Sequence, residues 1–539
     1  MDHSQSSVDI NSPITYLYLT FETEIPQPTV SETNDGDTNM SLSPPTPPDL
    51  QRFVSPYQWS SRRKALILYL SCIATMLSAY APSSYAVAGP AIAAEFGVSE
   101  AAVLWGITTF CWGYATAPMV LAPFSEIQGR YPVFVTAGVV FEICQICCAM
   151  TRSFPGMVVA RFWAGVGSSV FATMVGGVVS DLYHPKDIGN PMALFSGCAL
   201  FGIGVGPMIS GILAQNLDWR WVFWLQVILC GVLMVSIALF FSETRGSVLL
   251  SRKARALNRW YADREKLGYF GLEIISLDNN EEIKCRRVRW KVKSDEERET
   301  IGRMIGISLR RPVYLLVTEP VVFFFSLWVS FAWAVLFLML ESVPLVFKVS
   351  HGFDTQQIGA IFTVIAVGAI ISTIIYIFHD EYLVRAFSNL LTKRATFAET
   401  HRENPERYLY SSCIQSPLLP IGLFWFGWTQ FESIHWIVPT LALGCATMGI
   451  YSIYLATFNY LAAVYRRQGS SALAAQGFCR NMLGGVFPLV TAPMFKHLTF
   501  QGASSLLGGI GALLTIVPWV LVLYGPEIRA RSKIATEIM

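Results

Sequence analysis

Charged side chains inside or at the ends of long apolar stretches are the residues of this sequence best placed to do chemistry. Arg161 stands in ARFWAGVGSS (160–169), and Glu341 stands in LMLESVPLVF (338–347). A charge at the centre of a membrane span costs about 2.5 to 3.5 kcal/mol, so it normally faces a partner or a wet cavity. We expect Arg161 to change the proton affinity of an acidic group, with Glu341 as the first candidate and Glu142 as the second. Two simpler interpretations stay open, because Arg161 could extend to the membrane interface and Glu341 could lie among the outer headgroups.

A second feature is the stretch FGIGVGPMISG (201–211), where Gly202, Gly206, Pro207 and Gly211 interrupt an apolar segment. In water each glycine costs a helix about 1 kcal/mol relative to alanine, and proline removes a backbone donor. Inside a membrane, glycines let a neighbouring backbone approach closely, and a partner helix can satisfy the carbonyl that proline frees. The stretch therefore predicts a hinge and seal, and a kink used only for packing is the alternative.

A third feature is the loop APFSEIQGRYPV (122–133), in which Glu126 and Arg130 flank Gly129. Glycine permits a tight turn at this position. The two charged side chains can pair with each other or with neighbouring helix ends. We interpret the three residues as a latch on a cytosolic gate.

Composition shows which elements must carry these residues. Of the 539 residues, 53% are hydrophobic and 14% are charged, which is typical of a membrane protein. About 20 apolar residues span the hydrocarbon core as a helix. The sequence predicts an all-α membrane protein with twelve spans, near residues 65–87, 101–121, 131–150, 157–180, 191–214, 220–241, 314–340, 357–378, 412–429, 434–461, 472–496 and 503–524.

The distribution of basic residues predicts the orientation and the domains. Lys and Arg collect in loops that stay in the cytosol, and the largest cluster here, 17 of the 39, lies between the sixth and seventh spans. Both termini are therefore expected in the cytosol, and the basic linker is expected to touch anionic lipid rather than nucleic acid. The expected units are a disordered tail, a six-helix bundle, the linker, a second six-helix bundle and a C-terminal tail, at residues 1–60, 61–242, 243–312, 313–525 and 526–539.

Other polar and aromatic residues in the spans have simpler interpretations. Arg480 and Asn481 in the eleventh span are within reach of the cytosolic interface, which favours a structural role. Aromatic residues such as Trp112 and Trp333 could line a cavity for planar apolar molecules. Because aromatic residues are common in spans and at interfaces, we expect most of them to face lipid or the core.

The layout and these motifs resemble the major facilitator superfamily, and within it the fungal twelve-span drug:proton antiporters. The resemblance rests on Glu126, Gly129 and Arg130, on ARFWAGVGSS with its intramembrane arginine, and on GIGVGPMISG (202–211), which is similar to the antiporter motif. Further similar stretches are DWRWVFWLQ (218–226) and SPLLPIGLFWFGWT (416–429). The sequence departs from the family pattern in three places, where Ala122 and Ser210 replace glycines and Tyr131 replaces a basic residue.

The resemblance implies the major facilitator fold and proton-coupled efflux of amphipathic organic compounds across a fungal plasma membrane. Drugs, toxins and endogenous secondary metabolites are the expected substrates, and protons and membrane lipids are the other partners of a monomer. The proton gradient supplies the energy, so no cofactor or metal is expected, and no GxxxxGK[ST] phosphate loop is present. A nutrient or polyamine transporter of the same superfamily, a membrane-embedded enzyme and a non-transporting sensor are the alternatives. A scattered set of seven histidines without HExxH argues against the enzyme.

Overall fold

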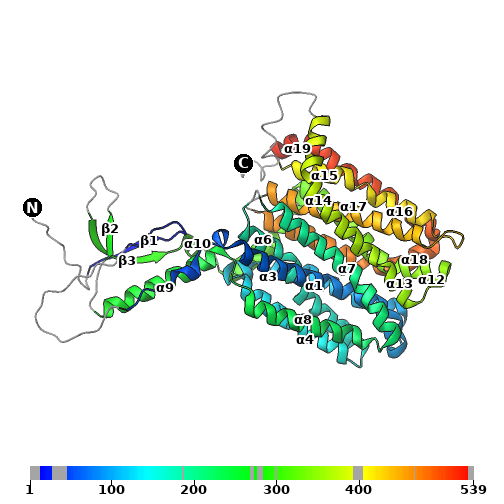
Figure 1. Cartoon of the computed structure of the whole chain (residues 1–539), viewed down its shortest axis with the longest axis horizontal. Coiled ribbons are helices and arrows are strands. Elements are labelled where there is room, and N and C mark those ends of the chain that lie inside the picture. The colour runs from blue at the N-terminus through cyan, green and yellow to red at the C-terminus, as the bar shows by residue number, and fades with distance from the viewer. Residues whose placement is uncertain are drawn as a thin grey trace, which may run out of the picture.

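The computed structural model describes residues 12–26, 45–184, 187–267, 272–275, 283–297, 300–391, 405–465 and 468–531. Long helices make up most of this chain and lie side by side in one body (Figure 1). The first half of the body contains α1 (Ser61–Phe96), α2 (Glu100–Val103), α3 (Trp105–Ile127), α4 (Arg130–Met150), α5 (Phe154–Thr173), α6 (Val175–Leu182), α7 (Gly189–Asn216) and α8 (Arg220–Phe240).

The second half of the body follows a connecting segment and is built in the same way. The connecting segment contains α9 (Gly246–Lys266), β2 (Leu272–Ile275), β3 (Ile283–Lys291), α10 (Lys293–Glu296) and α11 (Ile301–Thr318). The second half contains α12 (Pro320–His351), α13 (Thr355–Ile361), α14 (Thr363–Leu391), α15 (Arg407–Gln415), α16 (Leu418–Trp428), α17 (Ile437–Val464), α18 (Gly469–Leu514) and α19 (Ile516–Arg531).

Each of the twelve predicted spans coincides with helical structure. Within the described ranges, nine helical stretches are long and apolar enough to cross a membrane. One of them, Gly469–Ala530, covers two predicted spans, because Thr499 has a non-helical backbone and divides α18. The remaining two predicted spans are α3, which is long but less apolar and packs against α18, and the pair of short helices α15 and α16. The predicted fourth span is divided at Met174 into α5 and α6.

The two halves meet along two seams. One seam is formed by α3 and α18, and the other by α7 against α13, α14 and α17. The start of α1 and the end of α19 lie at the same end of the body as α9 (Figure 1). We call this end the linker face and the opposite end the far face. An even number of spans places the start of α1 and the end of α19 at the same face, because each span carries the chain to the opposite face.

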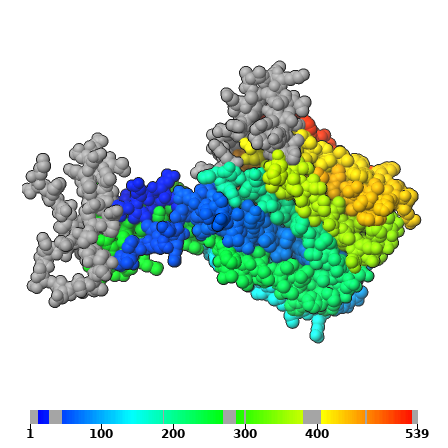
Figure 2. Space-filling model, in the orientation of Figure 1, coloured from blue at the N-terminus to red at the C-terminus, as the bar shows by residue number. Residues whose placement is uncertain are grey.

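A small sheet stands clear of the helical body beside α9 (Figures 1 and 2). Strand β1 (Ile14–Tyr18) pairs in parallel with β3, and β2 pairs with the other edge of β3 in antiparallel fashion. The all-α expectation therefore omits this sheet, and the expectation of a disordered tail is wrong for β1. Two short 3-10 helices, η1 (Leu50–Phe53) and η2 (Pro56–Gln58), lie in the same predicted tail.

Alternation explains why the strand β3 forms within a very basic segment. Val288, Trp290 and Val292 are buried in a cluster with Leu257 and Tyr261 of α9. Arg287 and Arg289, at alternate positions of the strand, lie outside this cluster and bind Glu265 near the C-terminal end of α9 at 3.0 and 2.6 Å. Strand side chains alternate between faces, so one face is apolar although the segment is basic. Burial raises the pKa of Glu265, but hydrogen bonds from the two arginines outweigh burial and leave the pKa below its ordinary value.

The pairing of the tail with the linker predicts a specific cross-link. Thr15 and Val288 are direct partners in the β1–β3 register, and paired strands bring such residues within disulfide reach. In a Cys285→Ser background, Thr15→Cys with Val288→Cys is expected to cross-link under mild oxidation. Cleavage at a protease site inserted between β1 and η1 would then leave the tail attached until reduction. Tyr18→Cys with Val288→Cys, three residues out of register, is the control, and equal cross-linking of both pairs would contradict the register.

Candidate functional site

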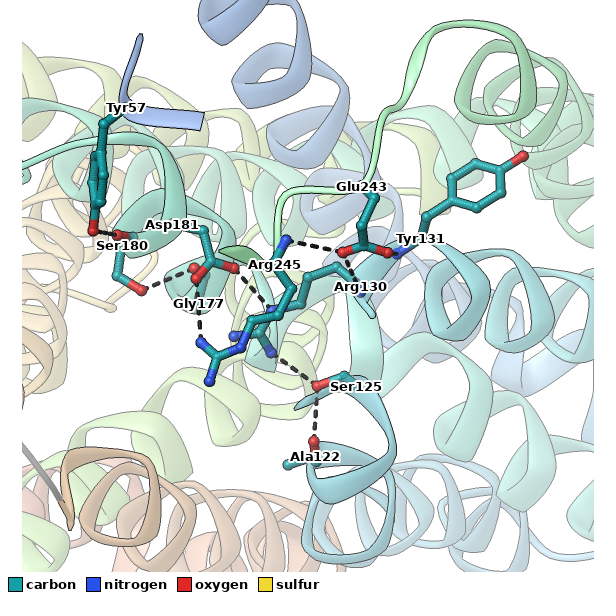
Figure 3. A network of polar contacts seen from close by, with 10 residues as sticks. All are labelled: Tyr57, Ala122, Ser125, Arg130, Tyr131, Gly177, Ser180, Asp181, Glu243 and Arg245. Carbon is teal, nitrogen blue, oxygen red and sulfur yellow. Dashed lines mark hydrogen bonds and ion pairs between the residues drawn. The ribbon is translucent and has the colours of Figure 1, made fainter. Parts of the chain in front are cut away.

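A cluster of charged groups joins four helix ends at the linker face (Figure 3). It begins at Gly129, whose φ of +106° is a conformation that favours glycine. A Cβ atom at this glycine would collide with the carboxylate of Glu243. That carboxylate accepts hydrogen bonds from the backbone N–H groups of Arg130 at 2.8 Å and Tyr131 at 3.3 Å. Glu243 therefore caps the N-terminus of α4, where a negative charge is favourable.

The guanidinium of Arg130 makes the central ion pair of the cluster. Its Nε atom lies 3.2 Å from Oδ2 of Asp181 in α6, and its Nη1 donates to the hydroxyl of Ser125 at 2.8 Å. The side chains of Arg130 and Asp181 are only 8% and 9% exposed. Glu126, the partner expected from the sequence, is half-buried and makes no hydrogen bond or ion pair with the described residues of this cluster. Arg130 thus binds a neighbouring helix end, which is the other arrangement the sequence allows.

Asp181 also holds the beginning of the linker. Its second oxygen accepts from Nη1 of Arg245 at 3.3 Å, and the backbone N–H of Arg245 donates to Glu243 at 2.9 Å. Gly177, one turn before Asp181, leaves room for the Arg130 guanidinium, since a Cβ there would lie 2.5 Å from Nη2. Two carboxylates and two arginines therefore tie together α4, α6 and the segment that enters α9.

The sequence contains a signal that identifies the missed partners. Asp181 lies at the end of the predicted fourth span, and Glu243 and Arg245 directly follow the predicted sixth span. Even-numbered spans end on the same side as the loop that carries Arg130. Charged residues at these ends are therefore close in any fold of this topology.

Arg161 lies deep inside the first half and does not reach an interface. Its side chain is 0% exposed, and it donates to the backbone carbonyls of Gly106 at 3.2 Å and Ala81 at 3.3 Å. Its guanidinium carbon lies 4.6 Å from the ring centres of both Tyr85 and Phe110. Aromatic faces stabilise a cation, so α1 and α3 provide an environment of carbonyl dipoles and rings.

The structure does not bring Arg161 together with its expected acidic partners. Glu341 is half-buried in α12. It has an electrostatic interaction with Glu100, at the start of α2. Glu142 lies beside α8, with Oε1 at 3.5 Å from the position of a Cβ on Gly231. Within the described chain, the groups bound to Arg161 are carbonyls and rings rather than a carboxylate.

The glycines of α7 allow two neighbouring helices, α1 and α13, to approach it closely from different sides. A Cβ at Gly202 or Gly206 would collide with α1, at the carbonyl oxygen of Met76 and the hydroxyl of Ser83. A Cβ at Gly211 would lie 2.9 Å from the carbonyl oxygen of Thr355, at the start of α13. Gly202 and Gly211 thus meet backbone atoms and Gly206 meets a serine hydroxyl, and this close approach depends on the missing Cβ of each glycine.

Pro207 lies in the same contact between the two halves. A Cβ on Gly359 of α13 would lie 2.6 Å from the carbonyl oxygen of Pro207, so the two backbones nearly touch. Pro207 is buried inside α7 and removes one of its backbone hydrogen bonds. Because α1 belongs to the first half and α13 to the second, α7 joins the two halves near the far face.

Comparison with known proteins agrees with this architecture of two helical halves. A family model described as Major Facilitator Superfamily matches residues 71–488. The chain belongs to this superfamily. It is therefore a multi-pass membrane protein of a family of small-molecule transporters and not an enzyme.

The relatives of this superfamily member include named efflux pumps of fungi. The efflux pump atB of Aspergillus terreus is 34% identical over 425 residues, covering 78% of this chain and 82% of the pump. The multidrug transporter FLR2 of Candida glabrata is 28% identical over 490 residues, covering 89% and 77% of the two chains. The expected resemblance to fungal drug and metabolite transporters is thus confirmed.

Solved structures confirm the fold. The proton:xylose symporter XylE of E. coli superposes with a TM-score of 0.60 at 13% sequence identity, covering 86% of this chain and 97% of the symporter. At this identity the likeness concerns the fold of the superfamily and not the substrate.

Two carboxylates near Arg130, Asp181 inside the ion-pair cluster and Glu126 outside it, are predicted to respond differently when their charge is removed. Asp181→Asn leaves two arginines without their shared counter-charge, and breaking a buried pair costs about 3 kcal/mol. Glu126→Gln is the matched control, because Glu126 is outside the ion-pair cluster. We expect Asp181→Asn to lower the thermal unfolding temperature of the purified protein clearly and Glu126→Gln to leave it near the wild-type value. A larger effect of Glu126→Gln would show that Glu126 is the true partner of Arg130.

Proposed function

We propose that this chain is a proton-driven efflux transporter that exports amphipathic organic compounds by alternating access. The observation that carries the proposal is the backbone contact of α7 with both halves, at the stretch that resembles the antiporter motif. Relatives named as efflux and multidrug transporters support the direction of transport. Transporters of this build move substrate by rocking two repeats around a site at the middle of the membrane.

The α7 contact suits a seal that opens and closes. Gly211 and Gly359 let α7 and α13 approach until their backbones touch, which leaves little space for solvent or substrate between them. At Gly211 and Gly359 the nearest atoms across the contact belong to the backbone, so no side chain of these two residues has to change its rotamer when the helices part. We assign Gly202, Gly206, Pro207 and Gly211 to this hinge and seal.

The charged cluster suits a latch at the opposite face. Gly129 and Arg130 hold α4 and α6 to the start of the linker through Asp181 and Glu243. Because the Arg130–Asp181 pair is buried, breaking it costs about 3 kcal/mol, so the cluster clearly favours the arrangement in which it is formed. In the proposal this latch stabilises the state in which the linker face is closed, and Glu126 has an accessory role at most.

The remaining assignments complete the proposal. The basic linker and both termini would lie in the cytosol of a fungal cell, and the far face would lie outside the plasma membrane. Protons would be exchanged for substrate by a monomer, with Arg161 and Glu341 as the groups that couple the two. Because no carboxylate contacts Arg161 in the described structure, the coupling would require a change in its surroundings during transport.

The seal predicts the effect of added bulk at one glycine. Gly211→Leu would force α7 and α13 apart, and overpacking of a close contact costs about 1 to 3 kcal/mol. We expect strongly reduced export from cells and greater labelling of cysteines placed at the far face. Gly509→Leu is the control, because this glycine of α18 is exposed and has open space around it. Wild-type export by Gly211→Leu at normal surface expression would remove the seal from the proposal.

Coupling is tested on Arg161 and on the gradient itself. Export by the wild-type protein should stop when a protonophore collapses the proton gradient. Arg161→Ala should lose gradient-driven export but keep substrate binding, and Arg161→Lys should keep a part, because it keeps the charge without the forked donor. Arg152→Ala, at an exposed arginine, is the control. Persistent wild-type export without a gradient would refute the antiporter, and unchanged export by Arg161→Ala would leave that arginine a purely structural role.

A further inference from the structure

A second buried arginine lies between the two halves, where the sequence suggests an interfacial one. Arg480 of α18 is only 2% exposed. Its guanidinium carbon lies 4.6 Å from the ring centre of Trp333 in α12 and 4.9 Å from that of Tyr454 in α17. Those two rings are themselves stacked, with centres 5.1 Å apart. Arg480 and Asn481, which the sequence places within reach of the cytosolic interface, are thus both buried within the protein.

The position of Arg480 is at the seam of α3 and α18. About one turn further along α18, the carbonyl oxygen of Gly485 accepts a hydrogen bond from the Thr108 hydroxyl of α3 at 2.7 Å. Tyr114, further along α3, has its hydroxyl within electrostatic range of the Arg480 guanidinium. The ring of Tyr454 also lies 6.4 Å from that of Phe195 in α7. The rings that hold the arginine thus belong to the second half, and Tyr114 of the first half lies near it.

Polar atoms at this seam lack partners. Nε and Nη1 of Arg480 are buried without a hydrogen bond to the described residues, and the same holds for Oε1 of Gln476 and Nε1 of Trp112. Gln476 is one helical turn before Arg480 on the same side of α18. Trp112 lies beside α18, with its ring 3.4 Å from the position of a Cβ on Gly485. Arg480 and Gln476 therefore present unused polar groups on one side of α18, and Trp112 has a further unused donor beside Gly485 along the same seam.

Physical chemistry makes such an arrangement costly without a ligand. A buried charge needs an opposite charge or a full set of hydrogen bonds. The described structure contains ion pairs for Arg130, Arg220 and Arg529 but none for Arg480. Two aromatic rings offset part of the cost, yet they leave the in-plane N–H donors of the guanidinium free. These donors match the two oxygens of a carboxylate.

We propose that Arg480 is the counter-charge for an anionic substrate, and that the exported compounds are aromatic or amphipathic carboxylates. The carboxylate would bind the guanidinium of Arg480, and the flat apolar part would lie against Trp333 and Tyr454. The inference rests on the proposed transport function and names its substrate class. It disfavours the polyamine alternative, because a polycation would be repelled by Arg480.

An anionic substrate also changes the energetics of export. The cytosol is electrically negative relative to the outside. Moving one charge across the membrane therefore changes the free energy by about 2.3 kcal/mol per 100 mV. Outward movement of an anion and inward movement of a proton both follow this field. Both parts of the exchange would therefore be driven by the membrane potential, whereas export of a cation would oppose it.

Three probes of nearly equal shape test the substrate class directly. They are naphthalene-2-carboxylate, the neutral naphthalene-2-carboxamide and the cationic naphthalen-2-ylmethylammonium. Binding is measured on the full purified chain in lipid nanodiscs by the rise in thermal unfolding temperature and by titration calorimetry. For the wild type we expect the carboxylate to bind about tenfold more tightly than the carboxamide, and the ammonium more weakly than both. Equal binding of all three probes, or tighter binding of the ammonium, would overturn the proposal without any variant.

Two variants assign the preference to Arg480. Arg480→Gln should remove the difference between carboxylate and carboxamide, and Arg480→Lys should keep part of it. Arg310→Gln, at an exposed arginine of α11, makes the same change of charge and should keep the full preference. If Arg480→Gln retained the preference, the anion would bind elsewhere and the proposal would fail.

Transport in proteoliposomes separates this inference from the proposed function. Uptake of the carboxylate probe is followed with an imposed proton gradient and with an imposed potential. A protein that binds the carboxylate through Arg480 but ignores the proton gradient would contradict antiport and support the anion site. A protein that shows proton-driven transport of the ammonium or the carboxamide in preference to the carboxylate would contradict the anion site and support antiport.

Discussion

The cost of burying a charge in an apolar body is the constraint on which the rest of this structure depends. Removing a guanidinium from water without compensation costs several kcal/mol, and the protein meets that cost in two ways. At the linker face, Arg130 and Arg245 share Asp181, and Glu243 holds the N-terminus of α4. In the interior, Arg161 and Arg480 lie against aromatic rings instead. The first solution fixes helix ends, and the second keeps a positive charge at depth.

Close approach of helices without large side chains is the second requirement of the architecture. Gly202 and Gly206 place α7 against α1, while Gly211 places it against α13. In a membrane, apolar side chains gain little by leaving lipid, so helix pairs depend on fit and backbone contact. A contact of glycines can form and part repeatedly. The same stretch that would weaken a helix in water therefore connects the two halves by backbone contact.

The sequence was sufficient for the helices and the general location of the site but not for its pairings. Long apolar runs identify spans because every backbone group in a membrane must be satisfied within a helix. Asp181 was missed because it lies about fifty residues from Arg130, and only the fold joins them. Strand β3 was missed because alternating Arg and Val residues resemble a solvated basic run. Its partner β1 lies in a polar tail more than 250 residues earlier, which no local pattern can reveal.

Arg480 illustrates a further limit of reasoning from one helix. Its distance from the end of the eleventh span allows the side chain to reach water, and the sequence does not tell which side of α18 it occupies. Tertiary packing decides this, since Trp333 and Tyr454 come from two other helices. Arg161 and Arg480, which lie against aromatic rings in the interior, then differ in role from Arg130 and Arg245, which are paired with Asp181 at the linker face. In the proposed cycle, the paired arginines hold helix ends at the linker face, Arg161 keeps its charge among carbonyls and rings, and Arg480 keeps unused donors for an anionic substrate. The proposed alternating access would therefore place paired charges at a gate, where they fix helix ends, and an unpaired charge at the centre, where a substrate can supply the opposite one.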